Sequence, residues 1–161
     1  MKSLRTRGFT LIELVITVAI VAILASVALP LNELVVQRGK EQDLRRALRE
    51  VREAIDAYKL ATEGTPPKIL KKVGDSGYPK RLEDLVEGID DQTSPKKAKM
   101  YFLRRIPRDP FDTDPARTAA QTWGIRSYAS PPDDPKDGDD VFDIYTKAPG
   151  KGINGRPYKE W

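Results

Sequence analysis

An apolar run from residue 9 to residue 29 constrains the fold of this chain more than any other part of its sequence. Between Leu14 and Leu29 the only polar residues are Thr17 and Ser26, whose hydroxyls can bond back to their own helix. About 20 helical residues cross the hydrocarbon core of a bilayer. Basic residues stand before the run, which places the N-terminus in the cytoplasm by the positive-inside rule. The run therefore predicts one membrane-spanning helix.

Glu13 lies near the start of this run. A carboxylate at membrane depth costs about 2.5–3.5 kcal/mol on insertion scales, and such residues usually mark a function. The alternative is that Glu13 sits near the membrane interface, where the cost is smaller. Residues 25–28, Ala-Ser-Val-Ala, are similar to the cleavage site of an ordinary signal peptide. A plain signal peptide leaves Glu13 unexplained, which favours a functional role for its charge.

Residues 7–13, Arg-Gly-Phe-Thr-Leu-Ile-Glu, resemble the class III leader motif of type IV pilins and type II secretion pseudopilins. The resemblance implies that a prepilin peptidase cuts between Gly8 and Phe9. Residues 1–8 are then a leader peptide, and the new amino group of Phe9 is N-methylated. Residues 9–30 are kept as a transmembrane and assembly helix.

Glu13 and Pro30 also stand where that family has a glutamate and a proline. In a filament the apolar helices pack together, and we expect Glu13 of one subunit to pair with the Phe9 ammonium of a neighbour. A low dielectric strengthens such a pair and makes either charge costly alone, so the pair is expected to set helix register. Pro30 removes a backbone donor. This predicts a kink rather than a simple helix stop, because helical patterning resumes after it.

Residues 31–63 carry an amphipathic pattern that predicts the periplasmic half of the same long helix. Gly64, Pro66 and Pro67 are expected to end it. The predicted apolar stripe consists of Leu44, Ala47, Leu48, Val51, Ala54, Ile55, Tyr58 and Ala61. A basic cluster on this segment is expected to be a solvated face or a filament contact, because interleaved acidic residues argue against DNA binding. The cluster consists of Arg45, Arg46, Arg49 and Arg52.

Residues 64–161 are predicted to form a small globular head. A short helix is expected over residues 79–86 and surface loops over residues 68–76 and 90–99. Residues 122–128 and 140–145 are predicted antiparallel strands, with a possible short third strand near residues 157–159. The fold class is therefore α+β: a long N-terminal helix, with a transmembrane half and an amphipathic half, packed on a small head with an antiparallel sheet. We expect the head to share its core with the helix.

The head also resembles that of the major pseudopilin of type II secretion, the G subunit. The resemblance lies in Gly77-Tyr78-Pro79, the Ile106–Phe111 block and the C-terminal Trp. It implies a structural subunit of a periplasmic filament that drives protein secretion. The implied partners are copies of the chain itself, minor pseudopilins, the prepilin peptidase and an inner-membrane assembly platform. The implied location is a single pass through the bacterial inner membrane, with the head in the periplasm. The alternative is a subunit, major or minor, of a surface type IV pilus for adhesion, motility or DNA uptake.

Major pseudopilins bind calcium in an Asp-rich C-terminal loop, and this chain departs from that pattern. Residues 146–155 contain Lys147 and Lys151 and no carboxylate, whereas calcium takes six to eight oxygen ligands. We therefore expect no standard calcium site and no cofactor. One alternative is that a lysine ammonium replaces the ion by bridging loop carbonyls and a carboxylate. Another is a site in the preceding acidic loop, which is more typical of a solvated turn. Its candidate ligands are Asp133, Asp134, Asp137, Asp139 and Asp140.

The composition excludes several classes of enzyme. The chain has no Cys and no His, which removes thiol nucleophiles, disulfides, Cys/His zinc sites and His-dependent triads. Asp109, Asp112 and Asp114 lie close in sequence, but Pro110 between them and Pro115 after them favour turns. We expect a protein that is not an enzyme; the alternative is a membrane-tethered enzyme or binding module with a borrowed leader.

The charge balance also argues against nucleic acid as a partner. The formal net charge is +4, from 28 Lys+Arg and 24 Asp+Glu. Without the three basic residues of the leader the balance is 25 to 24, or +1. The basic character of the chain therefore belongs mostly to the leader.

Overall fold

The structure is a computed structural model that describes residues 9–161, with the backbone alone at residues 27–30. Gly8 and the rest of the predicted leader lie outside the described residues. The chain divides into two compact units, Met1–Gly39 and Lys40–Trp161. The helix α1 (Leu11–Glu63) supplies residues to both units. Each unit is described separately below.

The first unit consists of the N-terminal part of α1. Its backbone remains helical at Pro30, so the alternative of a simple helix stop at that residue is wrong. The kink itself stays a prediction. By length and composition α1 is able to cross a membrane.

In the second unit, α1 carries the predicted apolar stripe. All eight stripe residues, from Leu44 to Ala61, are buried, as the spacing of three and four along the sequence predicts. The helix ends at Glu63, where the Gly64 N–H bonds to the Leu60 carbonyl over 3.1 Å. Gly64 does not adopt the left-handed conformation of a typical C-cap glycine, and Pro66 and Pro67 just beyond it are unable to continue the helix.

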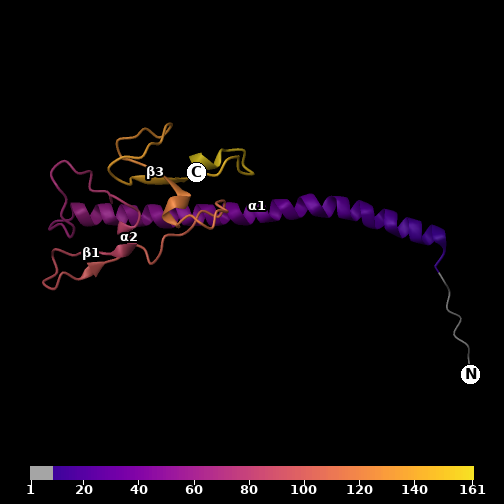
Figure 1. Ribbon diagram of the computed structural model, residues 1–161, viewed down its shortest axis with the longest axis horizontal. Coiled ribbons are helices and arrows are strands. Elements are labelled where there is room, and N and C mark those ends of the chain that lie inside the picture. The colour runs from indigo at the N-terminus through magenta and orange to yellow at the C-terminus, as the bar shows by residue number, and fades with distance from the viewer. Residues whose placement is uncertain (1–8) are drawn as a thin grey trace, which may run out of the picture. The chain divides into compact units, whose positions relative to one another are not determined.

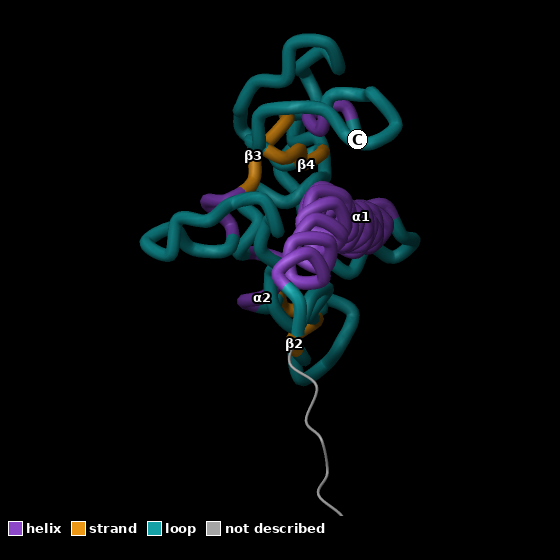
Figure 2. The backbone as a smooth tube through the Cα atoms, turned by 90° about the vertical axis from the view of Figure 1, so that its right-hand side faces the viewer, coloured by secondary structure: helices purple, strands orange, loops and turns teal. Residues whose placement is uncertain are grey.

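Two small sheets flank this part of α1. The strands β3 (Trp123–Arg126) and β4 (Asp143–Thr146) pair antiparallel, with Trp123 opposite Thr146. They lie on one side of α1, after the 3-10 helix η1 (Ala120–Thr122). The helix α2 (Asp84–Glu87) and the short hairpin of β1 (Ile89–Asp90) and β2 (Lys99–Met100) lie on the other side (Figures 1 and 2). The two predicted strands are confirmed, and the fold is α+β.

Three local predictions were wrong. The third strand is instead the 3-10 helix η2 (Tyr158–Glu160), and Pro157 bridges only to Lys151 among the described residues. The helix predicted over residues 79–86 is reduced to the four residues of α2, because Asp84 folds back to accept the Arg81 N–H at 3.0 Å. Residues 90–99 begin and end in the hairpin rather than forming a loop throughout.

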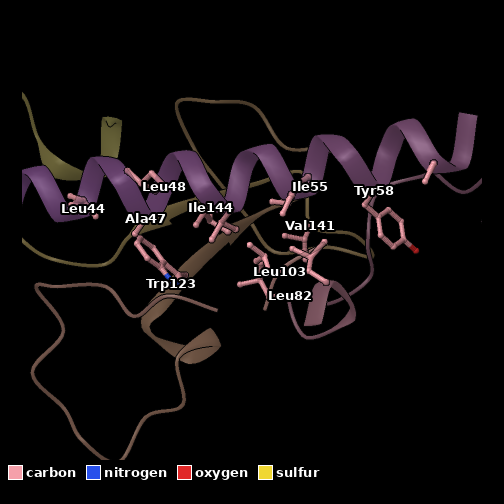
Figure 3. Close-up of a cluster of buried hydrophobic side chains, with 14 of the residues drawn as sticks. Leu44, Ala47, Leu48, Ile55, Tyr58, Leu82, Leu103, Trp123, Val141 and Ile144 are labelled. Carbon is pink, nitrogen blue, oxygen red and sulfur yellow. The ribbon is translucent and has the colours of Figure 1, made fainter. Parts of the chain in front are cut away.

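One hydrophobic core joins the helix to both flanking layers (Figure 3). Leu82, Leu85 and Leu103 come from the α2 side, and Trp123, Val141 and Ile144 come from the β3–β4 side. All of these pack around the stripe of α1. The prediction that helix and head share a core is therefore confirmed, and the head has no separate apolar centre of this size among residues 64–161.

Candidate functional site

The N-terminal end of α1 holds the predicted processing and assembly residues. Phe9 is 80% exposed and lies two residues before the helix begins at Leu11. Glu13 lies in the first turn, where its N–H bonds to the Thr10 hydroxyl over 3.3 Å. A negative charge is favourable at a helix N-terminus, because the first N–H groups there have no partner within the helix. Within residues 9–161 the Glu13 carboxylate has no ion-pair partner, so its charge is available to another chain.

The side chains of the following turns are apolar and exposed, as a surface in contact with lipid or with other helices requires. The Thr17 hydroxyl donates to the Leu14 carbonyl at 2.8 Å, and the Ser26 hydroxyl donates to the Ile23 carbonyl at 2.7 Å. Both polar groups are thus satisfied within the helix, as predicted. The exposed apolar residues include Leu11, Ile12, Leu14, Val15, Ile16, Val18, Ile20, Val21, Ile23 and Leu24.

In the second unit, the C-terminal loop is anchored by a buried carboxylate of α1. Glu41 is only 4% exposed. Its Oε1 atom accepts the Ile153 N–H at 2.9 Å and the Tyr158 hydroxyl at 3.1 Å. A hydrogen bond to a charged group contributes more than a neutral one. The loop therefore takes its position from the helix through these two bonds.

Two arginines of α1 hold the C-terminal residue. The Arg52 guanidinium pairs with Asp143 at 2.7 Å and donates to the Trp161 carbonyl at 2.8 Å. Arg45 stacks 4.2 Å from the centre of the Trp161 ring, a favourable cation–π contact. The basic cluster was predicted to be a solvated face or a filament contact. Arg45 stays exposed, as predicted, although it stacks on Trp161. Arg52 is partly buried against the head of its own chain, so the prediction of a solvated face or a filament contact is wrong for that residue.

The C-terminal loop offers no carboxylate of its own to a calcium ion. The nearby Glu41 carboxylate already accepts hydrogen bonds from a backbone N–H and a hydroxyl. The described part of the chain holds no group of three or more carboxylates placed to bind a metal. Lys147 donates from Nζ to the Gln121 carbonyl at 3.1 Å, which is one of the contacts expected if a lysine replaces the ion. For Lys151 no such contact is seen within residues 9–161.

The acidic loop between β3 and β4 is organised by local bonds. Asp140 accepts the Ser127 hydroxyl and the Tyr128 N–H, each at 2.8 Å. Burial raises the pKa of Asp140, but hydrogen bonds from Ser76, Tyr128 and Ser127 outweigh it and hold the pKa below its ordinary value. Asp134 pairs with Lys136 at 2.8 Å. The candidate ligands Asp133, Asp134, Asp137, Asp139 and Asp140 are thus not gathered around one point in the described structure.

Known proteins are similar to this chain in its N-terminal motif and in the sequence along most of its length. Residues 4–29 match the prokaryotic N-terminal methylation motif. The type II secretion system core protein G of Dickeya chrysanthemi is 26% identical over 159 residues, which cover 94% of each chain. The chain is thus similar to proteins with this motif at its N-terminus, and to core protein G along most of its length. It also resembles core protein G of Klebsiella michiganensis, with 29% identity over 67% of this chain and 70% of that one. Core protein G of Klebsiella pneumoniae is 27% identical over 68% of this chain and 72% of its own length. No solved structure matches the chain.

The sequence-based prediction did not include the anchoring role of Glu41, although the sequence carries a signal for it. Glu41 stands three residues before Leu44, so the helical spacing places it on the same buried face as the apolar stripe. A carboxylate on a buried stripe needs a partner, because an isolated buried charge is costly. Its partners lie in the C-terminal loop, which the sequence does not place.

Proposed function

We propose that this protein is a structural subunit of a periplasmic pseudopilus that drives type II protein secretion. A prepilin peptidase removes residues 1–8, and the remaining chain is held in the inner membrane by α1. Subunits then leave the bilayer and polymerise on an assembly platform, with minor pseudopilins as further partners. No catalytic residue is part of this function.

The observation that carries the proposal is the methylation motif at residues 4–29, which extends into α1 and includes the start of its exposed apolar surface. Similarity to core protein G along 94% of the chain supports the same role for the head. In the filament, Glu13 of one subunit pairs with the methylated amino group of Phe9 of the next. Water is excluded between packed helices, so this pair is strong. It therefore favours the helix register in which the two charges meet.

The test begins with the N-terminus of the protein purified from its own cells. Mass spectrometry is expected to find a chain that starts at N-methylated Phe9. Deletion of the gene is expected to stop release of secreted enzymes, and re-expression is expected to restore it. A chain that starts elsewhere, or secretion that continues without the protein, would overturn the proposal. Recovery of the protein in fibres sheared from the cell surface would instead identify a surface pilus subunit.

A further inference from the structure

Opposite charges are concentrated in two loops of the head that do not pair with each other. Residues 92–105, which include β2, contain five Lys or Arg residues and no carboxylate. Residues 133–140, between β3 and β4, contain five Asp residues and one Lys. Among the described residues no ion pair joins the two segments. Their sheets lie on opposite sides of α1 (Figure 2).

The acidic segment forms one wall of a cleft that suits a cationic side chain. The cleft has a volume of about 1060 Å³, and Asp137, Asp139 and Asp140 are among its lining residues. Tyr78 and Tyr128 also line it, with ring centres 5.7 Å apart in a stacked arrangement. Tyr128 is 62% exposed, so one face of its ring is open to a partner. Aromatic faces beside carboxylates attract ammonium groups. We call this the tyrosine–aspartate cleft.

The side chains that line the cleft carry more carboxylates than ammonium groups. Five carboxylates and three ammonium groups line it. One of the ammonium groups, that of Lys136, is paired with Asp134, and one carboxylate, that of Asp84, is paired with Arg81. Asp137 and Asp139 have no ion pair among residues 9–161. A further cation of the same chain, Lys59, lies 4.9 Å from the centre of the Tyr78 ring. Four carboxylates then remain beside two lining ammonium groups, so the cleft keeps a small excess of negative charge.

The turn between β1 and β2 carries the complementary, positive charge. Lys96 and Lys97 are exposed at this turn and have no ion pair within the described residues. Lys99 lies on β2, and its Nζ reaches the Glu87 carbonyl at 3.4 Å. We call this projection the basic hairpin. A narrow turn with free ammonium groups is able to enter a cleft that a flat surface could not.

We propose that the basic hairpin of one subunit docks in the tyrosine–aspartate cleft of the next. This inference rests on the proposed function and names one head-to-head contact in the filament. The hairpin turn and the cleft are separate surfaces of the subunit, although Ile89 of β1 and Asp84 of α2 also line the cleft. Each contact therefore leaves one hairpin and one cleft free. Such a heterologous contact adds subunits in one direction and does not close into a dimer. Opposite charges also guide a subunit into place and oppose wrong registers.

Disulfide trapping tests the contact in full-length protein, in cells that contain the rest of the secretion system. The chain has no Cys, so only introduced thiols can react. Ala98→Cys lies in the basic hairpin and Ala129→Cys lines the cleft, and both positions are exposed and uncharged. The double variant is expected to give a ladder of cross-linked multimers on mild oxidation, whereas each single variant is not. Ala116→Cys with Ala129→Cys is the matched control, since residue 116 is an exposed alanine in another loop.

Charge reversal provides a second test. Lys96→Glu with Lys97→Glu is expected to lower the yield of filaments about tenfold, because like charges then face each other. Adding Asp137→Lys and Asp139→Lys is expected to restore much of the loss. Lys159→Glu, an exposed change outside both surfaces, is expected to leave the yield unchanged.

The outcomes separate this inference from the proposed function. If wild-type filaments form but residues 98 and 129 do not cross-link to each other, the docking contact is wrong and the filament role stands. A cross-link from residue 129 to a different protein also overturns it, because the cleft then receives another partner. If the wild-type chain forms no filaments and does not support secretion, the proposed function itself fails.

Discussion

Glu41 accepts a hydrogen bond of 3.1 Å from the hydroxyl of Tyr158, which lies 117 residues further along the chain. The same carboxylate oxygen accepts the N–H of Ile153 at 2.9 Å. These bonds connect the long helix to the last loop of the head. A buried side chain of the helix therefore organises the last loop of the head.

Replacement of Glu41 is expected to destabilise the head. In the fragment of residues 40–161, which contains the whole core cluster, Glu41→Ala leaves a buried N–H and a hydroxyl without their acceptor. We expect a loss of about 2 kcal/mol in the free energy of unfolding, measured in urea. Asp43→Ala, at an exposed carboxylate two residues away, is the matched control. Equal stability of the two variants would contradict the anchoring role.

Calcium is expected to leave the same fragment unchanged. An ion bound at a hundred times its Kd stabilises a protein by about 2.7 kcal/mol, which is readily seen as a rise in Tm. Without carboxylates in residues 146–155, we expect equal Tm values in calcium and in a chelator. A clear rise in Tm with calcium would show that the loop binds the ion after all.

Gly152→Ala is expected to disturb the contact between Arg45 and the Trp161 ring. A Cβ atom at residue 152 would come within 2.2 Å of the Trp161 ring, so the ring must move away from Arg45. Overpacking of this kind costs about 1–3 kcal/mol. Differential scanning calorimetry is expected to show a lower Tm, together with a change in tryptophan fluorescence. Lys151→Ala, at an exposed neighbour, should change neither.

Acid is expected to weaken the head through Asp140. Its pKa in the folded protein lies below the ordinary value of 3.8, so folding favours the ionised form. The resulting stability is fully present above that ordinary value and is lost as the pH falls through the folded pKa. Asp140→Asn is expected to be less stable at pH 7 and to lose less stability on acidification. Parallel unfolding curves for both proteins between pH 7 and pH 3 would contradict this assignment.

Glu13→Ala is expected to abolish filament assembly while leaving processing intact. The substitution removes the charge that pairs with the amino group of a neighbouring Phe9, so correctly registered addition loses its electrostatic selection. Filament yield and the processed N-terminus should be measured together in cells. Glu33→Ala, at another exposed carboxylate of α1, is the control and is expected to assemble. Normal filaments from processed Glu13→Ala protein would refute the pairing.

The helical part of the fold could be predicted closely, because its signals are local and periodic. The stripe from Leu44 to Ala61 and the stop at Gly64 follow from spacing and from backbone preferences. The pair of strands β3 and β4 was also predictable, since alternation marks one buried face. The candidate assembly residues Phe9 and Glu13 came from a short contiguous motif.

The remaining elements depend on contacts between distant residues. A short strand was predicted near residues 157–159, but Tyr158 belongs to η2 and its hydroxyl donates to Glu41. Arg52 lies in a charged segment that suggests exposure, but its partner Asp143 stands 91 residues later. Propensity carries no information about such partners, and tertiary contacts override it.

The order in which the core is completed has a consequence for biosynthesis. The stripe of α1 is translated early, whereas the groups that cover and anchor it arrive late; Ile153 follows Glu41 by 112 residues. A nascent chain therefore exposes the apolar stripe of α1 until the loop that contains Ile153 has been made. Apolar surface that is exposed during this interval favours aggregation, so a chain that is interrupted before Ile153 is expected to aggregate.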